Sequence, residues 1–68
     1  MKVRINDTAI DLPGSSATLE QVVHHHGVTD VKGLAVAVNS TVIPRTNWSA
    51  FQLTENDTII IIRATQGG

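Results

Sequence analysis

The last two residues of the sequence, Gly67 and Gly68, carry the chemistry that stands out in this chain. A terminal α-carboxylate becomes an acylating agent once ATP converts it to a mixed acyl-phosphate anhydride, because the phosphate side is a good leaving group. Glycine has no Cβ and can therefore enter a narrow channel. Residues 65–68 reach on the order of 13 Å when extended at about 3.3 Å each. We expect a flexible tail that brings Gly68 into a partner's active site, with Gly67 needed for access.

The three consecutive histidines, His24, His25 and His26, form the other conspicuous cluster. Adjacent helical residues point about 100° apart, whereas side chains that meet on a helix lie three or four residues apart. The triplet is therefore interpreted as a solvated helix end that binds no metal, and we assign it no further role. The chain has no cysteine, hence no thiolate nucleophile, and no glycine-rich phosphate loop. We expect neither a bound cofactor nor an enzyme.

The charge and length of the chain limit its partners. The 68 residues carry five Lys and Arg against six Asp and Glu, a formal net charge of -1. No cationic surface is available to neutralise a phosphate backbone, so nucleic acid is not an expected partner. No apolar run reaches the roughly 20 residues of a membrane span, or forms a signal peptide. We expect a cytoplasmic domain that does not contact a membrane and is a monomer when free.

The start of the chain predicts a β-hairpin. Val3 and Ile5 alternate with polar residues, which is the period of a half-buried strand, and a second alternating segment covers residues 8–12. Asn6 and Asp7 lie between these segments, and both residue types accept the positive φ of a tight hairpin turn. The first two strands are therefore expected to pair with each other.

A helix and three further segments follow the hairpin. Thr18-Leu19-Glu20-Gln21 fits a capping box, which predicts that a helix begins there. Apolar alternation predicts a strand at residues 34–39 and a short one at 41–43. Residues 45–53 read as an irregular crossover, long enough to place the isoleucine-rich strand 58–64 beside the first strand in parallel.

These elements predict one two-layer α+β domain over residues 1–64, followed by the tail 65–68. The order looks like the ubiquitin-like β-grasp fold, a mixed sheet with one main helix packed on one face. Apolar residues that share a face by strand or helix period form the expected core. They are Val3, Ile5, Ile10, Leu12, Leu19, Val22, Val23, Val36, Val38, Trp48, Phe51, Leu53, Ile59 and Ile61.

The last strand also predicts a docking surface. Side chains alternate across a strand, so if the first and third of its four isoleucines pack on the helix, Ile60 and Ile62 point to the opposite face. The sequence offers no second helix to cover that face, and exposed isoleucines on a small domain indicate a binding site. We predict that Ile60 and Ile62 contact a partner, with Arg63 and Arg4 at the rim. Alternatively, the crossover over residues 45–51 folds onto this face.

Several motifs occur together along nearly the whole chain. They are the hairpin turn Asn6-Asp7, the strand Leu34-Ala35-Val36-Ala37-Val38-Asn39, the element Val42-Ile43-Pro44-Arg45 followed by Trp48, the turn Asn56-Asp57, and Gly67-Gly68. With this set the chain resembles the ThiS family, the sulfur carrier proteins of thiamine biosynthesis.

The resemblance implies a protein cosubstrate and not an enzyme. An adenylating enzyme of the ubiquitin-activating type would use ATP to convert the Gly68 carboxylate to an acyl-adenylate. A sulfur donor protein would then displace AMP and leave a thiocarboxylate, whose sulfur thiazole synthase would take. The chain would thus be a group carrier in the sense of lipoamide or biotin.

Three alternatives share the same fold. One is a sulfur carrier for another pathway, such as the small subunit of molybdopterin synthase or a carrier for tRNA thiolation. The second is a ubiquitin-like modifier that becomes conjugated to protein lysines. The third is a β-grasp module that binds without covalent chemistry, for which Gly67 and Gly68 would be dispensable.

Overall fold

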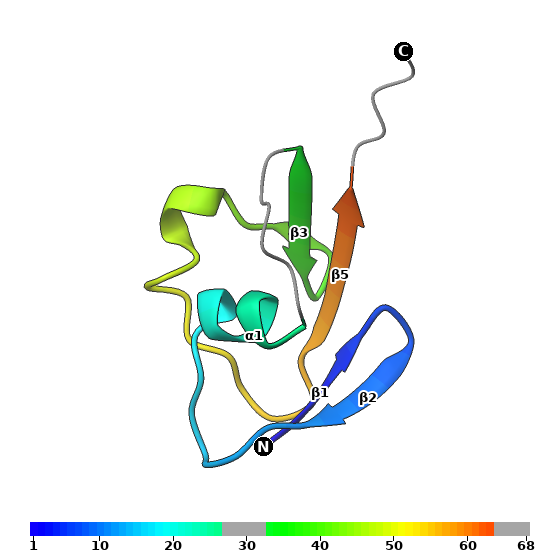
Figure 1. The fold of residues 1–68 in the computed structure, drawn as a ribbon, viewed down its shortest axis with the longest axis vertical. Coiled ribbons are helices and arrows are strands. Elements are labelled where there is room, and N and C mark those ends of the chain that lie inside the picture. The colour runs from blue at the N-terminus through cyan, green and yellow to red at the C-terminus, as the bar shows by residue number, and fades with distance from the viewer. Residues whose placement is uncertain (27–32, 64–68) are drawn as a thin grey trace.

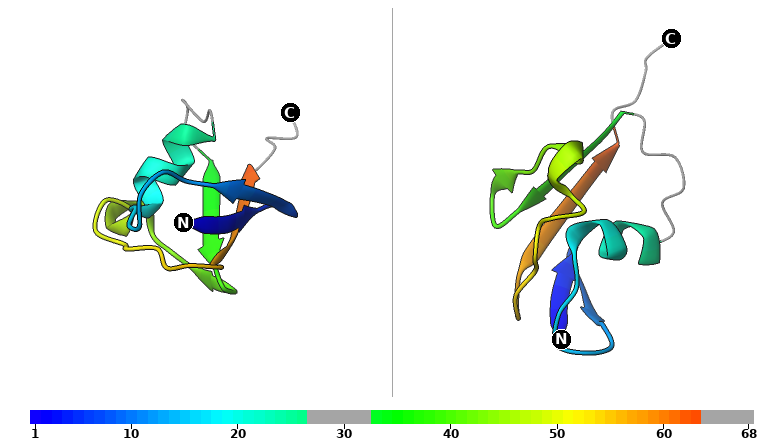
Figure 2. Two further views of the ribbon diagram at one scale, coloured as in Figure 1. Left: turned by 90° about the horizontal axis from the view of Figure 1, so that it is seen from below. Right: turned by 90° about the vertical axis from the view of Figure 1, so that its left-hand side faces the viewer.

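The computed structural model describes residues 1–26 and 33–63. Their elements are, in chain order, β1 (Lys2–Ile5), β2 (Thr8–Asp11), α1 (Leu19–His25), β3 (Leu34–Val38), β4 (Thr41–Val42), the 3-10 helix η1 (Arg45–Asn47) and β5 (Thr58–Arg63). The strands form one five-stranded sheet in the order β2-β1-β5-β3-β4 (Figure 1). Helix α1 lies on one side of this sheet (Figure 2, right). The two-layer α+β prediction is confirmed.

The hairpin forms as its turn residues require. Strands β1 and β2 pair in antiparallel register, and the connecting residues Asn6 and Asp7 have φ angles of 46° and 72°. These left-handed values give a two-residue turn a twist that matches that of the strands, and Asn and Asp tolerate them. Strand β5 then joins β1 in parallel, with Ile5 opposite Ile59. The predicted crossover connection is therefore correct.

Helix α1 is short and begins with the predicted capping box. The Thr18 hydroxyl accepts from the Gln21 backbone N–H at 3.2 Å, and the Gln21 side chain accepts from the Thr18 N–H at 2.9 Å. Three residues of the helix are buried, Leu19, Val22 and Val23. The histidines 24–26 at its other end are all exposed, as the interpretation of a solvated helix end predicts. In the described ranges, no helix is long and apolar enough to cross a membrane.

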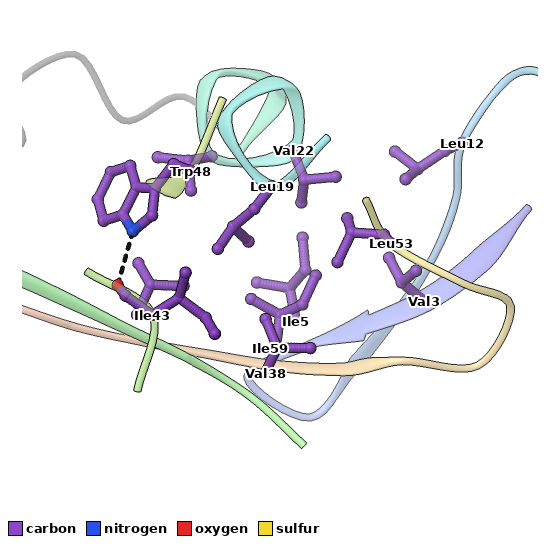
Figure 3. Close-up of a cluster of buried hydrophobic side chains, with 12 residues drawn as sticks. Val3, Ile5, Leu12, Leu19, Val22, Val38, Ile43, Trp48, Leu53 and Ile59 are labelled. Carbon is purple, nitrogen blue, oxygen red and sulfur yellow. Dashed lines mark hydrogen bonds between the residues drawn. The ribbon is translucent and has the colours of Figure 1, made fainter. Parts of the chain in front are cut away.

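The core lies between α1 and the sheet (Figure 3). Its buried residues are Val3, Ile5, Leu12, Leu19, Val22, Val23, Val36, Val38, Ile43, Trp48, Leu53 and Ile59. Three predicted core residues, Ile10, Phe51 and Ile61, are half-buried and pack against this cluster.

Ile43 is a core residue that the sequence pattern did not predict. The short strand expected over residues 41–43 covers only Thr41–Val42, and Ile43, which follows the exposed Val42 in the alternation, is buried on the helix side. The Ile43 backbone N–H donates to the Val36 oxygen at 2.9 Å, and its own oxygen accepts from the Trp48 indole N–H at 2.9 Å. The buried indole nitrogen is thereby satisfied, which a buried Trp requires.

The crossover packs beside the helix. The backbone N–H groups of Leu19 and Glu20 donate to the oxygens of Phe51 and Trp48, at 2.9 and 3.1 Å. Trp48 lies on the same side of the sheet as Leu19 and Val22 (Figure 3). The alternative in which residues 45–51 fold over the other face of the sheet is therefore wrong.

Candidate functional site

The sheet face turned away from α1 carries a group of apolar side chains. In the antiparallel register of β5 with β3, Ile60 lies opposite Ala37 and Ile62 opposite Ala35. Along the other edge of β3, Val42 of β4 lies opposite the same Ala37. Directly paired residues point to the same face of a sheet. We call these five residues, Ala35, Ala37, Val42, Ile60 and Ile62, the apolar sheet patch.

The apolar sheet patch holds the large apolar side chains that the described chain exposes. Val42 has 68% of its surface accessible and Ile62 has 58%, whereas Ile60 is half-buried between them. The alternation predicted for the isoleucines is confirmed, since Ile59 is buried on the helix side and Ile61 packs there against the core. Single exposed apolar residues are ordinary, but an apolar face that continues from Val42 across Ala37 and Ala35 of β3 to Ile60 and Ile62 favours a binding surface.

The two arginines predicted at the rim lie on different faces. Arg4 pairs with Thr58 in the parallel register, which places it on the face of the apolar sheet patch, and its Nη2 donates to the Asp7 oxygen at 3.4 Å. Arg63 pairs with Leu34 at the end of β5, and strand alternation puts it toward the helix side. The structure thus places Arg4 on the same face as Ile60 and Ile62, at the Thr58 end of β5, and places Arg63 toward the helix side at the other end.

Sequence reasoning missed Val42, Ala35 and Ala37 as members of this face. The signal was present, because Ala35 and Ala37 were visible as the small side of an alternating strand. Their register against β5 and β4, which decides what they adjoin, depends on pairing between segments far apart in the sequence.

The end of β5 is held by the side chain of Asn6. The Asn6 backbone N–H donates to the Ile59 oxygen at 3.0 Å, as in a regular parallel ladder. Its side-chain Oδ1 accepts from the Ile61 N–H at 2.9 Å, and its Nδ2 donates to the Ile61 oxygen at 3.2 Å. One amide side chain therefore satisfies both backbone groups of Ile61 on this edge of the strand.

The start of β5 is held by a buried carboxylate. Asp57 is the buried charged residue among those described, and it accepts from the Thr54 N–H at 2.8 Å, the Thr54 hydroxyl at 3.0 Å and Asn39 Nδ2 at 2.9 Å. Burial alone would raise the pKa of this carboxyl, but these three hydrogen bonds together hold the pKa below its ordinary value. The Asn39 Oδ1 also accepts from the Thr58 N–H at 3.0 Å. Asp57 is therefore ionised and structural at neutral pH.

The predicted reactive residues lie beyond this part of the structure. Gly67, Gly68 and the tail 65–68 are outside the described residues, which end at Arg63. Within residues 1–26 and 33–63, no three His, Asp or Glu side chains are grouped so that they could hold a metal ion. What the structure describes is thus an apolar face and a fixed strand end that leads toward the two glycines.

Comparison with known proteins identifies relatives of this chain. The model of the ThiS family matches residues 3–68. A crystal structure of the thiamine biosynthesis protein ThiS from Geobacter metallireducens superposes with a TM-score of 0.85, at 19% identity and with all of both chains covered. An NMR solution structure of a thiamine biosynthesis protein from the same organism superposes with a TM-score of 0.78 at 19% identity, and the match covers all of this chain and 88% of that chain. No curated protein matches the sequence. The structural matches confirm the β-grasp fold.

Proposed function

Since the chain belongs to the ThiS family, we propose that it is a sulfur carrier that supplies sulfur for the thiazole of thiamine. The match of the family model over residues 3–68 carries this proposal, because it includes both the β-grasp body and Gly67-Gly68. The carrier is a cosubstrate of other enzymes and does no catalysis itself.

The proposed chemistry takes place at the Gly68 carboxylate. A carboxylate oxygen attacks the α-phosphorus of ATP in an adenylating enzyme, pyrophosphate leaves, and an acyl-adenylate forms. A persulfide sulfur of a donor protein then attacks the acyl carbon and AMP leaves, which gives an acyl disulfide; a thiol reductant cleaves its S–S bond, and the thiocarboxylate and the donor thiol are released. The chain has no cysteine, so no thiol of its own competes for the activated acyl group. Thiazole synthase takes the sulfur, and an oxygen atom from the sulfur acceptor or from water replaces it to return the carboxylate.

The apolar sheet patch and Arg4 are proposed to dock the adenylating enzyme, with Arg63 at the strand end as a further contact. Ile62 is the next-to-last residue of β5, and five residues follow Arg63 in the sequence. At about 3.3 Å each these five reach on the order of 16 Å. A partner that covers the patch is thus close enough to receive Gly68 in its own active site, with Gly67 small enough to pass a narrow entrance.

The test of this proposal is an intact-mass measurement. The protein is incubated with ATP, the adenylating enzyme of the same organism and a sulfur source, after its mass has shown that the chain ends at Gly68. We expect a gain equal to the difference between sulfur and oxygen, and no gain in a variant that lacks Gly68. A gain that persists in that variant would place the acceptor elsewhere and refute the proposal.

Two further readouts separate the related functions. Thiazole formation by thiazole synthase, with the thiocarboxylated protein as the sulfur source, distinguishes a thiamine carrier from carriers of other pathways. Mass spectrometry of a lysate distinguishes a carrier from a modifier, because a modifier would be recovered as isopeptide-linked chain on protein lysines.

A further inference from the structure

Strand β5 extends beyond the strand that supports it on one edge. Strand β1 ends at Ile5, which lies opposite Ile59, whereas β5 continues to Arg63. The chain leaves the ladder at Asn6, whose φ of 46° begins the hairpin turn. On its other edge, β5 stays paired with β3 as far as Leu34 and Arg63.

The side chain of Asn6 replaces the backbone groups that the turn removes. In a regular parallel ladder, the residue that donates to the Ile59 oxygen also accepts from the Ile61 N–H through its own backbone oxygen. Here Oδ1 of Asn6 accepts that bond at 2.9 Å, and Nδ2 adds a donor to the Ile61 oxygen at 3.2 Å. The hairpin turn lies beside β5 in Figure 1. Both backbone groups of Ile61 are therefore bonded on the β1 edge, two residues before the strand ends, while β3 pairs along the other edge.

Few residue types meet both requirements of this position. The turn needs a positive φ, which glycine, asparagine and aspartate tolerate. The strand needs an acceptor and a donor on one short side chain, and only asparagine among these three supplies both. Glycine keeps the turn and loses both side-chain bonds. Aspartate keeps the acceptor and loses the donor, and its second carboxylate oxygen would repel the Ile61 oxygen.

We propose that Asn6 is a positioning residue for the carrier reaction, because it fixes the strand end from which Gly68 is delivered. This rests on the proposed function, in which a partner bound at the apolar sheet patch must receive Gly68 at a defined place. A fixed strand end narrows the directions that the following residues can take, and so raises the fraction of encounters with the carboxylate in attacking position. Docking itself does not depend on Asn6, which is a turn residue outside the patch.

The experiment compares Asn6→Gly with a matched variant at the other end of the same strand. Asn39 also has a positive φ, 50°, and its side chain also makes two hydrogen bonds, to Asp57 and Thr58. Asn39→Gly therefore makes the same chemical change at the start of β5. Adenylate formation is measured by ATP–pyrophosphate exchange with the adenylating enzyme of the same organism, at a temperature at which circular dichroism shows every variant folded.

We expect kcat to fall about tenfold in Asn6→Gly with KM for the carrier within about twofold of wild type, and both constants to stay near wild type in Asn39→Gly. Asn6→Asp should lie between wild type and Asn6→Gly. Equal kcat values for the two glycine variants would overturn the positioning role, and a rise confined to KM would make Asn6 a docking residue instead.

A second measurement on the protein alone keeps the two proposals separable. In Asn6→Gly, the Ile61 amide should lose at least about tenfold of its protection from hydrogen exchange relative to neighbouring β5 amides, and in Asn39→Gly it should not. If wild type supports no pyrophosphate exchange, the proposed function fails, while the Ile61 amide still decides whether Asn6 fixes the strand end. Unchanged protection of that amide refutes the inference whatever the partner does.

Discussion

A negative charge placed on the apolar sheet patch is expected to weaken binding of the adenylating enzyme without unfolding the carrier. Ile62→Glu is the preferred substitution, because 58% of the Ile62 surface is exposed and only a minor part of it packs within the domain. Substitutions at exposed positions usually change stability by less than about 0.5 kcal/mol. Ile60 is half-buried, so Ile60→Glu would mix a loss of packing with a loss of binding.

The expected magnitude follows from the exposed fraction. Full burial of an isoleucine side chain stabilises by about 1.5–3 kcal/mol. With 58% of Ile62 still exposed in the free protein, its burial by a partner contributes about 1–2 kcal/mol, or roughly a factor of 5 to 30 in Kd. Ile62→Ala should lose most of that factor. Ile62→Glu should lose more, because a carboxylate would have to be desolvated at the interface.

The assay is titration calorimetry of each variant against the adenylating enzyme, together with urea denaturation of the free carrier. Val42→Glu is a second patch variant, since 68% of Val42 is exposed. Thr46→Glu is the matched control, because Thr46 is an exposed residue of η1 in the crossover on the helix side. If the two patch variants bind as tightly as Thr46→Glu with unchanged denaturation midpoints, the apolar sheet patch is not the docking face.

Two further predictions concern stability. Trp48→Ala should lower the free energy of unfolding by about 3–5 kcal/mol, and Trp48→Phe by about 1–3 kcal/mol because the Ile43 oxygen loses its donor. Urea denaturation followed by far-UV circular dichroism measures both values. Denaturation midpoints near that of wild type would mean that the indole is not buried. The pKa of Asp57 is lower in the folded than in the unfolded protein, so its stabilisation is complete at neutral pH and is lost as the pH falls below about 3.9 toward the folded value. The acid loss should be smaller in Asp57→Asn, and an unchanged pH slope in that variant would contradict this assignment.

The parts of the fold that depend on neighbouring residues were predictable from the sequence. The turn at Asn6 and Asp7 and the capping box at Thr18 involve residues at most three apart, so composition and spacing determine them. The parallel pairing of β1 with β5 was predictable for a different reason, since a central apolar strand that follows a long crossover has few other places in a small sheet.

The parts that depend on packing between distant segments were not predictable. Ile43 precedes a proline at the end of an apolar run, and its burial depends on two distant partners: its N–H bonds the Val36 oxygen in register with β3, and its oxygen accepts from the Trp48 indole. Val42, its neighbour, points to the opposite face beside Ala37, with Ile60 on the far side of Ala37. The face that carries the candidate docking site was thus predicted from β5 alone. The full set of residues on that face follows only from the pairing register of β5, β3 and β4.

Two turn asparagines fix β5 at its two ends, and this links the stability of the domain to its proposed task. Asn39 bonds the N–H of Thr58 and the buried carboxylate of Asp57 at the start of the strand, while Asn6 brackets the peptide of Ile61 near its end. Both residues have a positive φ, which the sequence pattern explains through the turns alone. Their side-chain amides do something that a turn does not require, since glycine would serve the turn equally well.

A small domain without disulfides has little core to hold its strands, so side-chain bonds at strand ends contribute a larger share of its rigidity. Rigidity matters most along β5, because the residues that follow this strand are those proposed to enter a partner's active site.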